Sequence, residues 1–176
     1  MISSRLRFYL VFGTLLAFGI GCKPQSSNAQ IGIFPTLRIK AGLFLPQNSS
    51  LRNAVGNTWI KLGADVGLPV GFALLGGSTR VGIDYVANGS SSIIPITLTS
   101  IMQPSIGLHS PVYVGGGVGF WTGHIKGSGT STRFGLRLLG GVEISNKAFV
   151  ELQYDIVDKL GNTRADGFSF LVGTKF

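Results

Sequence analysis

Twelve charged residues alternate with apolar residues between Leu37 and Phe176, so that all twelve share one side of the chain. Collected in one enclosed space, they could line a narrow polar pore whose basic excess favours anions. Opposite charges could instead pair and fill the space, which neutralises buried charge. We predict this plug rather than the pore. The set consists of Arg38, Lys40, Lys61, Arg80, Arg133, Arg137 and Lys175, with Asp65, Asp84, Glu143, Glu151 and Asp155.

A histidine and a serine, the residue types of a general base and its nucleophile, are neighbours at His109 and Ser110. Adjacent residues of a strand point to opposite faces, so these two side chains do not pair simply. His124 lies near Lys126 in a polar stretch, where a solvated loop histidine is the simpler interpretation. No His/Cys cluster has metal-ligand spacing. We predict no enzymatic activity and no catalytic, cofactor-binding or metal-binding residue.

Eight strands are predicted to position the charges, because apolar and polar residues alternate with a period of two. The fourth is the least regular, since Ile93 and Ile101 blur the alternation. The predicted strands span residues 36–45, 58–68, 79–87, 93–102, 111–121, 132–144, 147–155 and 167–176.

An apolar face is present in too many of these strands for one small core to bury all of them. A closed barrel with apolar side chains toward lipid and polar ones in its lumen accommodates this pattern. A charge on the lipid face would cost about 2–4 kcal/mol near mid-bilayer, which explains why that face lacks charge. We predict an all-β, eight-stranded antiparallel transmembrane up-and-down barrel. A soluble lipocalin-like barrel is the alternative, and it would need the apolar face inside.

The interior of an eight-stranded barrel is about wide enough for side chains alone. Glycines on the inner face are therefore expected to make room for large neighbours. The glycine-rich run 115–119 fits this role, since it lacks the lysine and helix of a phosphate-binding loop. Aromatic residues near strand ends are predicted to form interfacial girdles. These residues are Trp59, Trp121, Tyr154, Phe168 and Phe176.

The connections predict which end of the barrel faces outward. Asn146 and Lys147 allow a tight turn, and an even number of strands leaves both termini on the periplasmic side. The outer loops are then 46–57, 88–92, 122–131 and 156–166. The stretch 69–78 is long and apolar for a periplasmic turn. Its residues 72–75 either extend the neighbouring strands or form an interfacial helix.

The N-terminus has the features of an export signal. Arg5 and Arg7 precede an apolar stretch, and Ser27-Asn28-Ala29 supplies small residues for cleavage before Gln30. We predict a signal peptide over 1–29 and a barrel domain over 30–176. Lipidation of Cys22 is the alternative. Removing Arg5, Arg7 and Lys23 leaves 12 of the 15 basic residues against seven acidic ones, a net charge of +5. The basic residues are dispersed, so nucleic-acid binding is not expected.

The sequence GGVEISNKAFVELQYD at 140–155 resembles the penultimate hairpin of small OmpA-like and porin-family outer-membrane barrels. Phe168, Phe170, Val172 and Phe176 resemble the C-terminal signal that such proteins present to the outer-membrane assembly machinery. The resemblance implies an outer-membrane location in a Gram-negative-type bacterium, with outer-membrane lipid and lipopolysaccharide as partners. It carries no activity of its own.

A structural or surface-interaction role is accordingly the predicted function. A narrow small-solute pore and an outer-membrane lipid-modifying enzyme are the alternatives. The oligomeric state stays open.

Overall fold

The computed structural model describes residues 36–68, 77–103, 111–161 and 163–176. The predicted signal peptide, Cys22, the stretch 72–75, His109 and Ser110 lie outside these residues. No helix within the described ranges is long and apolar enough to cross a membrane.

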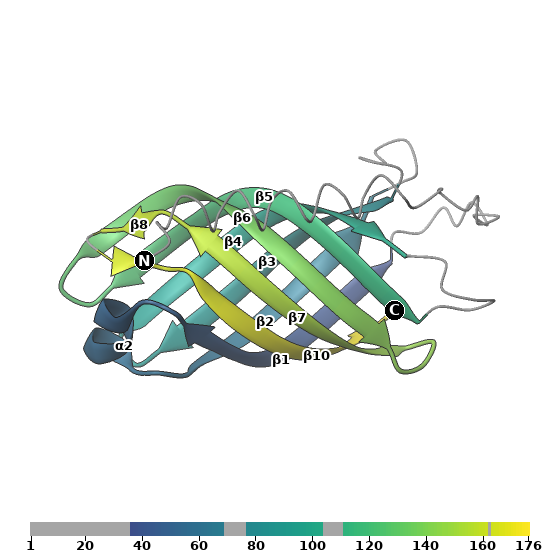
Figure 1. The fold of residues 1–176 in the computed structure, drawn as a ribbon, viewed down its shortest axis with the longest axis horizontal. Coiled ribbons are helices and arrows are strands. Elements are labelled where there is room, and N and C mark those ends of the chain that lie inside the picture. Colours follow the sequence, from purple (N-terminus) through teal and green to yellow (C-terminus); the bar gives the residue numbers. More distant parts are fainter. Residues whose placement is uncertain (1–35, 69–76, 104–110, 162) are drawn as a thin grey trace, which may run out of the picture.

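Eight antiparallel strands close into a barrel in the order β1-β10-β7-β6-β5-β4-β3-β2 (Figure 1). Each strand pairs with its neighbour in sequence, and β1 closes the barrel through pairs from Arg38↔Lys175 to Pro46↔Gly167. The predicted all-β barrel and its eight strands are confirmed. The barrel strands are β1 (Leu37–Pro46), β2 (Trp59–Gly67), β3 (Ser78–Asn88), β4 (Ser91–Met102), β5 (Val112–Ile125), β6 (Gly129–Glu143), β7 (Ala148–Val157) and β10 (Gly167–Lys175).

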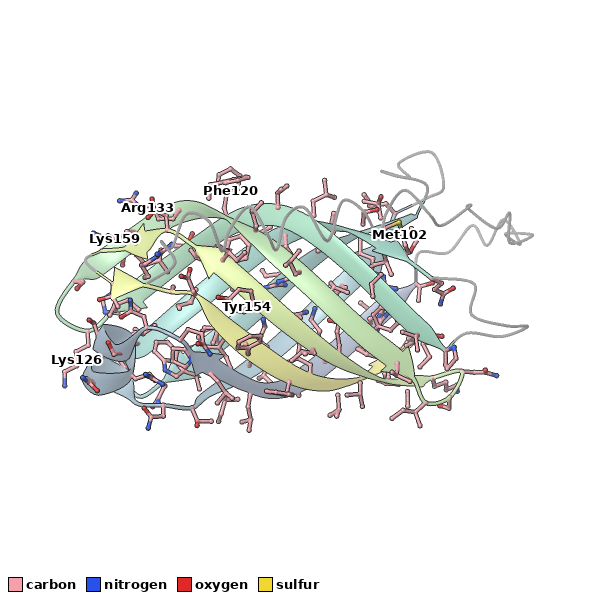
Figure 2. The ribbon with its side chains drawn as sticks, viewed as in Figure 1. Met102, Phe120, Lys126, Arg133, Tyr154 and Lys159 are labelled. Carbon is pink, nitrogen blue, oxygen red and sulfur yellow. The ribbon has the colours of Figure 1, made fainter. Side chains whose placement is uncertain are left out.

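Side chains alternate between the two faces of the wall as the sequence predicts. The outward residues are large, apolar and exposed, for example Ile60 at 63% and Ile83 at 52%. The inward residues of the same strands include buried Lys61 and Asp84. Figure 2 shows Phe120 projecting away from the wall. A soluble lipocalin-like barrel would have the opposite arrangement, so that alternative is wrong.

Two small elements cover one end of the barrel, called here the α2 end (Figure 1). Helix α2 (Ser49–Val55) begins at Asn48, whose side chain accepts hydrogen bonds from the backbone N–H groups of Ser50 and Leu51. The two-stranded hairpin of β8 (Lys159–Leu160) and β9 (Thr163–Arg164) follows β7. Leu51 and Leu160 from these elements are fully buried. The opposite end, where β1 begins and β10 ends, is called the terminal end.

The predicted outer loop at 122–131 is wrong, because the ladder between β5 and β6 continues to Ile125↔Gly129. Its threonines and glycines look typical of a loop, but the pairing of strands needs only their backbone groups. The connection consists of residues 126–128, and both Gly127 and Gly129 have positive φ, which glycine adopts without strain. The predicted loop at 46–57 contains α2, and the loop at 156–166 contains β8 and β9. The two longer connections at the α2 end are therefore partly built of their own helix and hairpin.

Candidate functional site in the barrel interior

Arg137 is the centre of the buried charges. Its guanidinium binds Asp155 through two bonds, Nε to Oδ1 at 2.6 Å and Nη2 to Oδ2 at 3.0 Å. These two residues are directly opposed on β6 and β7. The remaining nitrogen, Nη1, lies 2.7 Å from Oδ2 of Asp84, which comes from β3. All three side chains are at most 3% exposed, so one arginine compensates two buried carboxylates.

Two lysines from β1 and β2 extend this cluster. Lys40 Nζ lies 2.8 Å from both carboxylate oxygens of Asp65 and 3.5 Å from Asp84. Lys61 Nζ donates to Gln153 at 2.7 Å and lies 3.4 Å from both Asp84 and Asp155. Asp84 thus contacts three cations. The pairs cross the lumen between non-adjacent strands and tie opposite walls together.

A second group lies nearer the terminal end. Arg38 donates from Nη2 to the Tyr113 hydroxyl at 2.7 Å, and that hydroxyl donates to Glu151 Oε2 at 2.9 Å. Gln153 donates to the other Glu151 oxygen at 2.6 Å. The Arg38 guanidinium also lies 3.6 Å from the centre of the Phe149 ring, within cation–π distance. Glu151 is therefore engaged at both oxygens.

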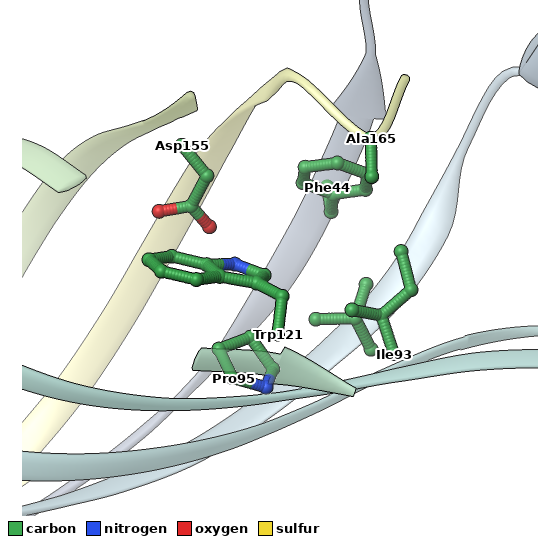
Figure 3. Close-up of a pocket in the computed structure, with 7 residues that line it drawn as sticks. Phe44, Ile93, Pro95, Trp121, Asp155 and Ala165 are labelled. Atoms are coloured by element: carbon green, nitrogen blue, oxygen red, sulfur yellow. The ribbon is translucent and has the colours of Figure 1, made fainter. Parts of the chain in front are cut away.

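Apolar side chains close the lumen at the α2 end. The layer consists of Phe44, Leu51, Trp59, Val86, Ile93, Trp121, Ile125, Val157, Leu160 and Ala165. Figure 3 shows the Trp121 ring between Asp155 and Pro95. A void of about 10 Å³, close to the space of one water molecule, is lined by five residues of this layer together with Pro95 and Asp155. At the terminal end, Ile101, Tyr113 and Leu139 form a smaller apolar cluster. The group around Arg137 thus lies between the apolar layer of the α2 end and this smaller cluster.

The girdle prediction is wrong for Trp59 and Trp121, which are only 1% exposed inside the barrel. Both residues occupy inward positions of the alternation, so their phase overrides the general preference of tryptophan for the interface. The other three girdle aromatics point outward. Tyr154 and Phe168 stack with ring centres 4.5 Å apart, and Phe176 is 71% exposed. The aromatic positions 168, 170 and 176 share this outer face with Val172.

Inner-face glycines provide the space for large neighbours, as the sequence predicts. A side chain at Gly141 would overlap the Tyr113 ring, and one at Gly173 would overlap Phe149. A side chain at Gly63 would overlap the Asp84 carboxylate. Gly116 faces outward and would meet nothing closer than 3.6 Å. The glycines of the inner face therefore shape the charge cluster.

The structure places eleven of the twelve charged residues in three settings. Eight of them are buried inside the barrel, and Arg80 is half-buried at the terminal end. Lys175 and Glu143 form a 2.8 Å ion pair at the rim of that end. The buried eight are Arg38, Lys40, Lys61, Asp65, Asp84, Arg137, Glu151 and Asp155.

Arg133 does not belong to the lumen, which corrects the prediction. The β6–β7 ladder ends at Gly135↔Val157, so Arg133 lies beyond the last pair at the α2 end. It is exposed there and donates from Nε to the Lys159 carbonyl at 3.0 Å. Figure 2 shows both residues at this rim.

Neutral polar residues complete the site. The prediction from the sequence did not include them, because it considered charged residues alone. Tyr113, Gln153 and Ser169 are buried and join the charged groups by hydrogen bonds. Their inward phase is visible in the alternation and could have identified them. His124 is exposed and lies 3.2 Å from the Thr130 hydroxyl. Among the described residues, no group of three His, Cys, Asp or Glu is placed to hold a metal.

No protein-family model matches the sequence, and no curated protein matches it. Solved structures do. Neisserial surface protein A (NspA) aligns with a TM-score of 0.58 and 16% identity, covering 80% of this chain and 95% of that chain. The N-terminal β-barrel domain of Pseudomonas aeruginosa OprF aligns with a TM-score of 0.52 and 11% identity, covering 81% and 98%. The predicted resemblance to eight-stranded outer-membrane barrels is thereby confirmed for the fold.

Proposed function

We propose that this protein is an integral outer-membrane barrel with a structural or surface-interaction role and a lumen plugged by its own side chains. The observation that carries the proposal is the inverted distribution of side chains. Leu62, Ile96 and Phe170 are more than half exposed on the outer face, whereas Arg137 and Lys61 are buried within. Such a face is stable only where lipid covers it.

The plug follows from the pairing inside. Every buried carboxylate lies within 4.0 Å of at least one cation, and several bridge two or three strands. Fixed ion pairs of this kind neutralise one another and fill the narrow lumen, which leaves little room for a passing ion. The apolar layer around Trp59 and Trp121 blocks the α2 end. A surface role is then left to the connections around α2 and β8.

Export and assembly belong to the same proposal. Residues 1–29 serve as the signal peptide, with lipidation of Cys22 as the alternative. The C-terminal signal for the assembly machinery consists of Phe168, Phe170 and Val172 on the last strand and Phe176 directly after it. Outer-membrane lipid and lipopolysaccharide then surround the apolar face.

Fractionation of cells that express the full chain tests the location. We expect the protein in the outer-membrane fraction, migrating faster in electrophoresis before heating than after it, because a closed barrel resists detergent until boiled. Intact mass of the same material separates cleavage before Gln30 from a lipid on Cys22. Complete recovery in a salt-washed soluble fraction contradicts the proposal.

The pore is the second candidate, and the polar lumen favours it. Planar-bilayer recordings of the refolded barrel separate the two functions. We expect no channel events, because the apolar layers and the ion pairs occupy the lumen. The variant Trp121→Ala, which opens the apolar layer, serves as the comparison. Regular conductance steps from the unaltered protein would establish the pore and reject the plug.

A lipid-modifying enzyme is the third candidate. It needs a serine within hydrogen-bond reach of an oriented histidine. Of the two histidines, His124 contacts Thr130, and His109 lies outside the described residues. We propose no catalytic activity. Incubation of the refolded barrel with phospholipid and lipopolysaccharide, followed by mass analysis of the lipids, would reveal one.

A further inference from the structure

The barrel interior contains one more positive than negative charge. All seven acidic residues of the sequence lie within the described ranges. Asp65, Asp84, Glu151 and Asp155 lie in the lumen. Glu143 pairs with Lys175 at the rim, and Asp158 and Asp166 lie at the α2 end. Against the four lumen carboxylates are five cations, namely Arg38, Lys40, Lys61, Arg80 and Arg137.

The excess is located at Arg80. No carboxylate of the described residues lies within 4.0 Å of it, and the chain has no acidic residue elsewhere. Its guanidinium lies over the Tyr113 ring at 5.5 Å from the centre. Glu151 is the lumen carboxylate that accepts a hydrogen bond from Tyr113, the residue whose ring Arg80 covers. Its oxygens already accept hydrogen bonds from Tyr113 and Gln153, so it has little capacity left for Arg80.

Arg38 lies on the same ring, 5.1 Å from its centre, and is 2% exposed. Its Nε and Nη1 atoms have no hydrogen-bond partner. Buried guanidinium N–H groups without an acceptor carry a desolvation penalty, and such groups need an explanation in a stable protein. Two arginines thus lie around one tyrosine, and two buried N–H donors of Arg38 are left without an acceptor there.

We propose that the terminal end of the lumen binds a small oxyanion of the phosphate or sulfate type, held by Arg80 with Arg38 and Tyr113 behind it. The half-buried Arg80 gives access from solvent, whereas the α2 end is closed by the layer around Trp59 and Trp121. An anion here neutralises the excess lumen charge. A guanidinium presents paired N–H donors that match two oxygens of one oxyanion, which favours phosphate over chloride.

Titration calorimetry on the refolded full barrel, in a non-ionic detergent at low salt, tests the site with sodium phosphate as the probe. We expect saturable binding of one phosphate, with sodium chloride giving no comparable signal. Arg80→Gln should weaken binding at least about tenfold, the effect of losing one charge-assisted contact. Arg80→Lys should restore part of the affinity, because lysine keeps the positive charge but lacks the paired N–H donors of a guanidinium. Arg133→Gln, an exposed arginine at the α2 end, should change it less than about twofold.

Urea unfolding of the same variants gives a readout that a purely structural role would not produce. Without phosphate, Arg80→Gln should unfold at an equal or higher urea concentration than the unaltered protein, since it removes the excess charge. With phosphate, only the unaltered protein should gain resistance, because a ligand stabilises the state that binds it. Equal phosphate affinity of the unaltered protein and Arg80→Gln overturns the proposal. So does the absence of phosphate binding in the unaltered barrel. If Arg80→Gln does not fold, Arg80→Lys decides by the same comparison.

Discussion

Replacing Arg137 with methionine should destabilise the barrel by about 3–5 kcal/mol, the usual effect of removing one partner of a buried ion pair. Asp84 and Asp155 would each lose their closest cation, at 2.7 and 2.6 Å. Methionine preserves an unbranched chain beside the Trp121 ring, so the loss reports charge more than packing. Urea unfolding of the barrel refolded in lipid vesicles measures the difference.

An exposed ion pair supplies the control. Arg164 pairs with Asp166 at 3.3 Å, but its side chain is 56% exposed. Arg164→Met should therefore change the free energy of unfolding by less than about 1 kcal/mol. The double variant Arg137→Met with Asp155→Asn should recover part of the loss, because one stranded carboxylate becomes neutral. A change below about 1 kcal/mol for Arg137→Met alone would mean that water screens the lumen, which contradicts a closed plug.

The period-two alternation was enough to predict the eight strands and the direction of nearly every side chain. It gives the face of a residue but not its height along the barrel. Arg133 has the inward phase, yet it lies beyond the point where β7 stops pairing. The exposure of Arg133 depends on where the neighbouring strand β7 ends, and the sequence of β6 alone does not show this.

The partners of the charges could be predicted only in part. Arg137 and Asp155 are opposed in one hairpin, so a correct turn register would have paired them. Asp84 reaches Arg137 from β3 across the lumen, and that contact depends on how the whole barrel closes. The apolar layer was missed for a similar reason. Trp59 and Trp121 look like interfacial residues until α2 and β8 are known to fold over that end.

The charge cluster and the outer face constrain each other. Inward charge requires pairing because the lumen is narrow, and outward apolar residues require lipid because they are exposed. The first condition is met within the chain except at Arg80. The second condition depends wholly on the surroundings. A change on the outer face therefore probes the membrane, and one in the lumen probes the plug.

Ile83 lies at the middle of β3 on the outer face and is 52% exposed. Ile83→Arg should destabilise the barrel by about 2–4 kcal/mol in lipid vesicles, because the charge would lie near the centre of the bilayer. The same change at Ile144, which is 67% exposed just past the end of β6, should cost about 0–1 kcal/mol, since it lies near the interface. Urea unfolding in vesicles measures both.

The comparison of the two sites separates lipid from water as the solvent of this face. In water, an arginine at an exposed position of either kind would change stability by no more than about 0.5 kcal/mol. A penalty at Ile83 that exceeds the one at Ile144 thus requires a hydrocarbon layer around the middle of the barrel. Equal and small effects at the two positions would contradict the transmembrane arrangement, even if the fold itself stayed intact.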